Sequence, residues 1–151
     1  MILSVGLVLY RRGVAGPEVL VGHMGGPFFA RKHEGGWSFP KGPAEDGESP
    51  LEVAEREFAE EMGSAPPAGD SIDLGTAKAS GKTFHLFARE GDFDADVAVS
   101  NTFEMEWPRG SGRTQTFPEI DRAAWVALDE VEMLLAKGQR PFVARLRDAL
   151  G

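Results

Sequence analysis

The positions of apolar and polar residues along the chain predict alternating strands and helices. Two runs rich in β-branched and apolar residues, Ile2–Tyr10 and Glu18–Met24, predict the strands of a hairpin. Residues 25–42 contain many glycines and prolines and predict a long loop, in which Trp37–Phe39 could form a short strand.

The second half of the chain predicts more strands and a helical end. Strands are expected at residues 71–80, 82–90, 101–107 and 123–128. The segment 108–122, rich in Gly, Ser and Pro, is expected to be a loop. Residues 129–136 predict one or two helical turns, and 141–150 has the apolar period of a helix. Several strands with one central helix favour an α/β fold, a mixed sheet covered by helices.

The best-defined helix is predicted to begin after Ser49 and to end at Gly63. Ser49 is a natural N-cap, and Glu52 completes an S-x-x-E capping box with it. An apolar stripe for the core is expected from residues at helical spacing, namely Leu51, Ala54, Phe58 and Met62. Glu57 and Glu61 flank this stripe, with Glu60 beside them. Like charges at such spacing destabilise a helix by roughly 0.2–0.5 kcal/mol per pair, so their repulsion needs an explanation.

Composition narrows the classes of function. The 151 residues predict a single domain over residues 1–151. A net charge of −8 disfavours a module that binds a nucleic acid polymer, because such modules need a basic surface. The absence of cysteine excludes disulfides and thiolate metal sites. The short apolar start has no basic segment before it and no small-residue cleavage site after it, unlike a leader peptide. No other apolar run is long enough to span a membrane. We therefore expect a cytoplasmic protein without a membrane partner.

Two interpretations fit the acidic helix. An acidic face turned to water is the ordinary one. The other is a metal site, since the carboxylates lie beside the core stripe and a Gly-rich loop with Lys41 leads into the helix. Magnesium prefers oxygen ligands and commonly binds a few carboxylates together with substrate phosphates. A bound cation would turn the repulsion between the three glutamates into coordination.

The helix and the loop before it resemble the signature of the Nudix hydrolases, G-x5-E-x7-R-E-U-x-E-E-x-G-U, in which U is a bulky apolar residue. Residues 42–64 match it in register at Gly42, Glu48, Arg56, Glu57, Phe58, Glu60, Glu61 and Gly63. The one departure is Ser64, which stands where the signature has an apolar packing residue. The preceding WSFPKG is similar to the same stretch in family members that act on dinucleoside polyphosphates or diphosphoinositol compounds.

The resemblance implies a Nudix-type α/β/α sandwich around a central mixed β-sheet, and hydrolysis of a diphosphate with Mg²⁺ or Mn²⁺. It implies that Glu57, Glu60 and Glu61 are metal ligands, to which the Gly42 carbonyl could add another. It also implies that a salt bridge between Glu48 and Arg56 holds the loop–helix–loop in shape. The general base is left open, because family members place it either in the signature helix or on a later loop.

Several residues outside the signature have two interpretations each. Lys41 could reach a substrate phosphate or remain an exposed loop lysine. Trp37 could stack on a base or pack in the core. Arg109 and Arg113 flank a Gly-Ser-Gly turn in a loop that could clamp a phosphate or lie in solvent.

Later carboxylates and an aromatic pair are further candidates. A remote base or an additional ligand could come from Glu104, Glu106 or Glu119. Phe28 and Phe29 are expected to be buried rather than to line the substrate entrance. The three histidines show no metal-ligand spacing and are expected to be structural or exposed.

We therefore predict a metal-dependent pyrophosphohydrolase that cleaves a phosphoanhydride in a nucleoside diphosphate-linked compound. A nucleoside triphosphate or a dinucleoside polyphosphate is the favoured substrate, and a nucleotide sugar or ADP-ribose is the alternative. A non-catalytic nucleotide-binding sensor of the same fold is the alternative function, although such sensors often lack signature glutamates and none is missing here. An isomerase of isoprenoid diphosphates would need a site cysteine, which the chain lacks. The expected partner is a small phosphorylated molecule, with the protein a monomer or a homodimer.

Overall fold

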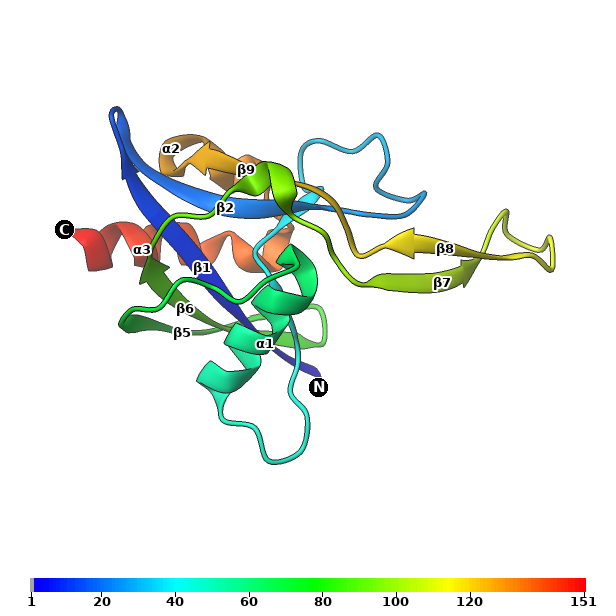
Figure 1. The fold of residues 1–151 in the computed structure, drawn as a ribbon, viewed down its shortest axis with the longest axis horizontal. Helices are drawn as coiled ribbons and strands as arrows, with labels where there is room; N and C mark the ends of the chain where they lie inside the picture. The colour runs from blue at the N-terminus through cyan, green and yellow to red at the C-terminus, as the bar shows by residue number, and fades with distance from the viewer. Residues whose placement is uncertain (1) are drawn as a thin grey trace.

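A seven-stranded mixed β-sheet forms the centre of the fold, with helices on both faces (Figure 1). The computed structural model describes residues 2–151. Along the sheet the strands follow the order β3 (Trp37–Ser38), β2 (Gly16–Met24), β1 (Ile2–Gly13), β6 (Lys82–Glu90) and β5 (Ser71–Ala79). In addition, β4 (Lys41–Pro43) pairs with β1, and β9 (Ile120–Ala127) pairs with β2. Because β1 is parallel to β6 but antiparallel to β2 and β4, the sheet is mixed, as predicted.

Strand β1 contributes to a hydrophobic cluster on each face of the sheet. Leu7 and Leu9 pack with α1 (Pro50–Met62), whereas Val8 and Tyr10 belong to the cluster that contains α3 (Pro141–Leu150) and α2 (Leu128–Val131). This alternation is the two-residue period of a strand that is covered on both sides. Three 3₁₀ turns complete the helical layers, η1 (Ala95–Val97), η2 (Glu132–Leu134) and η3 (Lys137–Gln139). The predicted α/β/α sandwich is confirmed. None of the helices in residues 2–151 has the length and apolar character needed to span a membrane.

The segment 108–122 corrects the prediction of a loop. A ribbon of two antiparallel strands, β7 (Thr102–Glu106) and β8 (Thr114–Pro118), projects from the body of the fold (Figure 1). The threonines and Phe117 of β8 suit a strand and pair with β7, with Phe117 opposite Phe103. The Gly and Ser residues that suggested a loop form only the turn at the tip, and β9 already begins at Ile120.

The buried face of α1 also differs from its predicted stripe. Ala54, Phe58 and Met62 are buried as expected, but Leu51 is half-exposed and Val53 is buried instead. Val53, Glu57 and Glu61 form a second buried row at four-residue spacing, next to the apolar row. The two glutamates therefore lie within the buried face of the helix rather than at its edge.

The long loop between β2 and β3 contains another correction. Phe28 was expected to be buried, but 56% of its surface is exposed. It contacts the projecting ribbon instead, edge to face with Trp107 at 5.5 Å between ring centroids. The fully buried His23 anchors the loop, because its Nε2 lies 2.6 Å from the carbonyl oxygen of Lys32 and its Nδ1 lies 3.0 Å from Asp121.

Candidate active site

A cleft of about 310 Å³ lies between α1, β4 and the first residues of β1 and β6. It is lined by Glu57, Glu60 and Glu61 of α1, and by Lys41 and Gly42 of β4. Pro43, the last residue of β4, also lines it. The remaining lining comes from distant parts of the chain: Ile2, Ser4, Lys82, Asn101, Thr102 and Glu119. The cleft thus gathers the three signature glutamates with residues as far apart in the sequence as Ile2 and Glu119.

The start of α1 fixes the position of the glutamates along the helix. The Ser49 hydroxyl accepts a hydrogen bond from the Glu52 N–H at 3.3 Å, and the Glu52 carboxylate accepts one from the Ser49 N–H at 3.0 Å. This is the predicted capping box. At the other end, Gly63 has φ 88°, the left-handed conformation that ends a helix and favours glycine. The two caps thus fix where the helix begins and ends.

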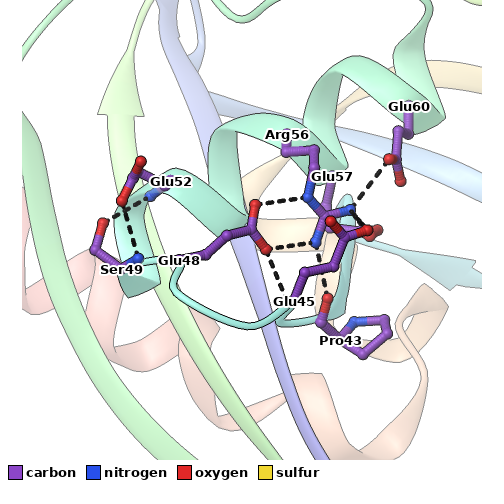
Figure 2. Close-up of polar contacts among 8 residues, drawn as sticks. All are labelled: Pro43, Glu45, Glu48, Ser49, Glu52, Arg56, Glu57 and Glu60. Atoms are coloured by element: carbon purple, nitrogen blue, oxygen red, sulfur yellow. Dashed lines mark hydrogen bonds and ion pairs between the residues drawn. The ribbon is translucent and has the colours of Figure 1, made fainter.

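Arg56 is the centre of the polar network on α1 (Figure 2). Its Nε and Nη2 donate to the two carboxylate oxygens of Glu48, at 2.8 and 2.9 Å. Its Nη1 donates to Glu57 at 3.0 Å and to Glu60 at 3.1 Å. Nη2 also donates to the Pro43 carbonyl oxygen at 2.9 Å, which ties the helix to the end of β4. These bonds raise the pKa of Arg56 and lower that of Glu48, the largest cause in both cases being the bond between them.

The carboxyl groups of Glu57 and Glu61 are buried beside this network, each residue being 7% exposed. Burial, and secondly the charge of Glu60, raises the pKa of Glu57 to about 7. Burial also raises the pKa of Glu61 to about 7, although Lys41 opposes this shift. Two carboxylates that are costly to ionise lie side by side, so a cation in the cleft would stabilise their charged form.

Gly42 leaves the space that the Glu57 carboxyl group occupies. A Cβ atom at Gly42 would lie 2.0 Å from Glu57 Oε2 and 2.2 Å from its Cδ, which is closer than atoms can approach. Any side chain at this position would therefore displace the carboxyl group of Glu57. The first glycine of the signature thus has a steric role, independent of its carbonyl oxygen.

The strand β4 that carries Lys41 and Gly42 is positioned by a buried amide from the far end of the chain. Gln139 accepts a hydrogen bond from the Phe39 N–H at 2.8 Å and donates one to the Ser38 hydroxyl at 2.8 Å. The Lys41 N–H then donates to the Glu61 carboxylate at 3.3 Å. Sequence reasoning did not find Gln139, because its partners lie about a hundred positions away.

Three cleft residues that sequence reasoning missed are Lys82, Asn101 and Thr102. Asn101 is attached directly to the acidic helix, since its N–H donates to the Glu60 carbonyl oxygen at 2.8 Å. Its own carbonyl accepts from the Glu119 N–H at 2.8 Å, which places Glu119 in the cleft as well. Of the three later carboxylates considered as a remote base, Glu119 is therefore the one that the structure brings to the site.

The other predicted site residues lie elsewhere. Trp37 is 4% exposed and packs against His23, so its ring offers almost no surface to a base. Glu104 and Glu106 lie along the projecting ribbon, and the Glu106 carboxylate accepts from the N–H groups at the ribbon's tip. Arg109 and Arg113 are exposed residues of the turn at this tip and do not line the cleft.

The donor set of the cleft fits a hard divalent cation, because it consists of carboxylate and carbonyl oxygens. Within residues 2–151, however, no three acidic or histidine side chains converge as they stand into a group that could hold a metal ion. The hydrogen bonds explain this arrangement, since Arg56 holds Glu57 and Glu60 while the Lys41 N–H holds Glu61. A metal ion bound here would compete with these hydrogen bonds for the carboxylate oxygens of the three glutamates.

The chain matches the family model described as NUDIX domain over residues 2–146, and no curated protein matches it. It is similar to a C. elegans Ap4A hydrolase in a binary complex, with 18% identity, a TM-score of 0.64 and 97% of both chains covered. It is also similar to the NUDIX domain of Shewanella oneidensis NrtR complexed with ADP ribose (18%, TM-score 0.63, 100% of this chain and 89% of that one). A Nudix hydrolase from M. smegmatis, RenU, shares 22% identity at a TM-score of 0.59, over 97% of this chain and 84% of its own. At these identities the solved structures show a shared fold.

The buried glutamates predict that the metal-free protein becomes less stable as the pH rises. Both carboxyl groups have a pKa of about 7 in the folded chain, against an ordinary value of 4.5. The folded state therefore holds more protons than the unfolded state between these values, so the free energy of unfolding falls from about pH 4.5 to about pH 7. Thermal denaturation in the presence of EDTA measures this dependence.

A double variant provides the control for this pH dependence. Glu57→Gln with Glu61→Gln lacks both titrating groups and should show a flatter profile between pH 4.5 and pH 7. Glu48, whose pKa is lowered, acts in the opposite direction and below pH 4.5, so it does not obscure this window. Stability of the parent that rises over the window, or a slope that the double variant retains, would contradict the assignment.

Arg56→Ala should lower the melting temperature and the activity together. The variant loses the five hydrogen bonds that Arg56 donates and leaves crowded carboxylates without their cation. The expected loss is roughly 5 °C, because solvent screens the contacts of Arg56 with the partly exposed Glu48 and Glu60. Arg12→Ala is the control, because Arg12 is exposed and has only a loose ion pair with Glu90 at 3.8 Å. An unchanged melting temperature with a selective rise in KM would instead place Arg56 on the substrate.

Proposed function

The chain belongs to the NUDIX family, and from this premise we propose that it is a metal-dependent pyrophosphohydrolase that cleaves a phosphoanhydride bond in a nucleotide. The observation that supports this best is the pair of buried carboxylates, Glu57 and Glu61, in a cleft with Glu60, Lys41 and Lys82. Carboxylates of this kind suit a divalent cation, and lysines suit phosphate oxygens.

We propose that Glu57, Glu60, Glu61 and the Gly42 carbonyl hold Mg²⁺ or Mn²⁺. When bound, such an ion would neutralise phosphate charge and activate a water molecule. Arg56 and Glu48 keep the glutamates in place, and Gly42 leaves room for the Glu57 carboxyl group. Lys41 lines the same cleft and would contact a phosphate oxygen.

In the proposed reaction the oxygen of a water molecule attacks one phosphorus atom of the diphosphate. A new P–O bond forms, the bridging P–O bond breaks, and the second phosphate leaves with the bridging oxygen. The proton of the attacking water goes to a carboxylate of the cleft, for which Glu57, Glu61 and Glu119 are the candidates.

We propose a nucleoside triphosphate or a dinucleoside polyphosphate as the substrate. The support is the WSFPKG stretch before the signature, together with the similarity to a C. elegans Ap4A hydrolase. A nucleotide sugar or ADP-ribose is the second candidate, because the NUDIX domain of NrtR, which shares the fold, is complexed with ADP ribose.

A panel of nucleotides in ¹⁸O-labelled water tests this proposal with matched variants. The parent should release products with Mg²⁺ or Mn²⁺ but not with EDTA, and the label should appear in a phosphate-containing product. Glu57→Gln and Glu61→Gln should each lower turnover at least about 100-fold, because a metal ion contributes several kcal/mol to the reaction. The control is Glu130→Gln, on an exposed residue of α2.

The same samples give a second readout. Divalent ions should raise the melting temperature of the parent and of Glu130→Gln, and should raise that of the Glu57 and Glu61 variants less, since ligands stabilise the state that binds them. Variants at Glu57 and Glu61 that bind metal and turn over like the parent would show that the site is assigned wrongly.

A further inference from the structure

His23 on β2 is a buried titratable residue that the proposed reaction does not use. Its side chain is fully buried, and both of its ring nitrogens face oxygen atoms. Nδ1 lies 3.0 Å from each carboxylate oxygen of Asp121 on β9, and Nε2 lies 2.6 Å from the carbonyl oxygen of Lys32. An ionised carboxylate and a carbonyl group both accept hydrogen bonds. A neutral imidazole has a single N–H and satisfies one of them, whereas an imidazolium satisfies both.

Two elements bring charged or titratable side chains to the surroundings of the His23 ring, β9 and the loop of residues 25–36. On β9 these are Asp121 and Arg122, whose guanidinium donates to the Asp121 carboxylate at 3.2 Å. Those in the loop are all exposed: Arg31, Lys32, His33 and Glu34. Strand β3 contributes the uncharged ring of Trp37, edge to face at 5.1 Å between ring centroids. The charged group in direct contact with the ring is thus an anion, with which an imidazolium forms a charge-assisted hydrogen bond.

The contact with Lys32 attaches the middle of the loop to the sheet. Within the loop, the Phe29 N–H donates to Gly26 and the Lys32 N–H donates to Phe29, so these backbone bonds are local turns. The His23 ring joins this stretch to β2. Gly36 leaves space for the contact, because a Cβ atom there would lie 2.4 Å from the Lys32 carbonyl oxygen and 3.2 Å from His23 Nε2.

The loop in turn contacts the ribbon formed by β7 and β8. Phe28 packs edge to face with Trp107, and the Arg109 guanidinium lies 5.9 Å from the centroid of the Phe28 ring. The ring of Phe103 lies against Gly26, where a Cβ atom would approach it to 2.9 Å. Through these contacts the position of the loop is linked to the position of the ribbon.

We propose that His23 is a pH-sensitive switch, which attaches the loop of residues 25–36 to the sheet when its ring is an imidazolium and releases the loop when the ring is neutral. As the pH rises, Nε2 gives its proton to solvent as the loop opens, while the Nδ1–H group continues to donate to the Asp121 carboxylate, the stronger acceptor. The Nε2 lone pair would otherwise face the lone pairs of the Lys32 carbonyl oxygen. The hydrogen bond to the loop is therefore present at low pH and lost at high pH.

Ring ¹⁵N NMR together with amide hydrogen exchange tests the switch from about pH 5.5 to about pH 8.5, the range in which histidine changes its charge. In the parent, both ring nitrogens of His23 should be protonated at the low end and Nδ1 alone at the high end. The protection factors of the Lys32 and Gly36 N–H groups should fall at least about tenfold over this range, the size expected for one charge-assisted hydrogen bond.

Two substitutions have opposite expected outcomes. Asp121→Asn offers an amide N–H to Nδ1, so a neutral ring donates from Nε2 to Lys32, and the loop should stay protected over the whole range. His23→Gln has no ring that joins the two acceptors and no proton to lose, so protection of the loop should be low throughout. If this buried substitution unfolds the chain, the ring spectra of the parent and the exchange data of Asp121→Asn still decide the question.

His33→Gln and the double variant Glu57→Gln with Glu61→Gln are the controls, and both should keep the pH response of the parent loop. His33 is exposed and accepts from the Trp37 ring N–H at 3.4 Å, so its protonation acts in the opposite direction. The double variant separates the switch from the change in global stability. An unprotonated ring nitrogen of His23 already at about pH 5.5, loop protection that does not change with pH, or a response that Asp121→Asn retains would overturn the proposal. None of these measurements depends on hydrolysis of a nucleotide.

Discussion

The site depends on the burial of two carboxyl groups, Glu57 and Glu61, between α1 and β4. The helix turns them inward because Val53, Glu57 and Glu61 form one row of its buried face, beside the row of Ala54, Phe58 and Met62. Burial of this kind is unfavourable for ionised groups, and it raises the pKa of both to about 7. The surrounding structure contains what such a pair needs: a guanidinium group, a backbone N–H, and a glycine that leaves room for a carboxyl group. Burial of these two carboxyl groups lowers the stability of the fold, but it holds their oxygen donors close together in a cleft where a cation would bind favourably.

The cleft brings acidic and basic residues together from different elements of the fold. The glutamates lie on α1, whereas Lys41 and Lys82 approach from β4 and β6 on either side of β1. The ribbon formed by β7 and β8 is acidic along one side of β7, where Glu104 and Glu106 follow Thr102 at every second position. The ribbon's arginines occupy its tip, where Arg109 contacts Phe28.

Local sequence patterns predicted the parts of this site that are local in the chain. The capping box, the left-handed stop at Gly63 and the ion pair between Glu48 and Arg56 all involve residues fewer than fifteen positions apart, and all are present. The rotation of α1 was only partly predicted, since the burial of Glu57 and Glu61 depends on the contact with β4. Lys82, Asn101 and Gln139 were missed because strand register and long-range hydrogen bonds bring them to the site. The strand at Thr114–Pro118 was missed because Gly, Ser and Pro nearby outweighed its short alternating pattern.

Anomalous X-ray scattering from crystals soaked with Mn²⁺ tests most directly whether the buried glutamates form a metal site. We expect a manganese peak in the cleft within coordination distance of the Glu57 and Glu61 carboxylates and next to the Gly42 carbonyl oxygen. The Glu57 side chain should have rotated away from Arg56, while the bond between Arg56 and Glu48 remains. Manganese bound only elsewhere on the protein, with Glu57 and Glu60 still on Arg56, would contradict a metal-dependent function for this cleft.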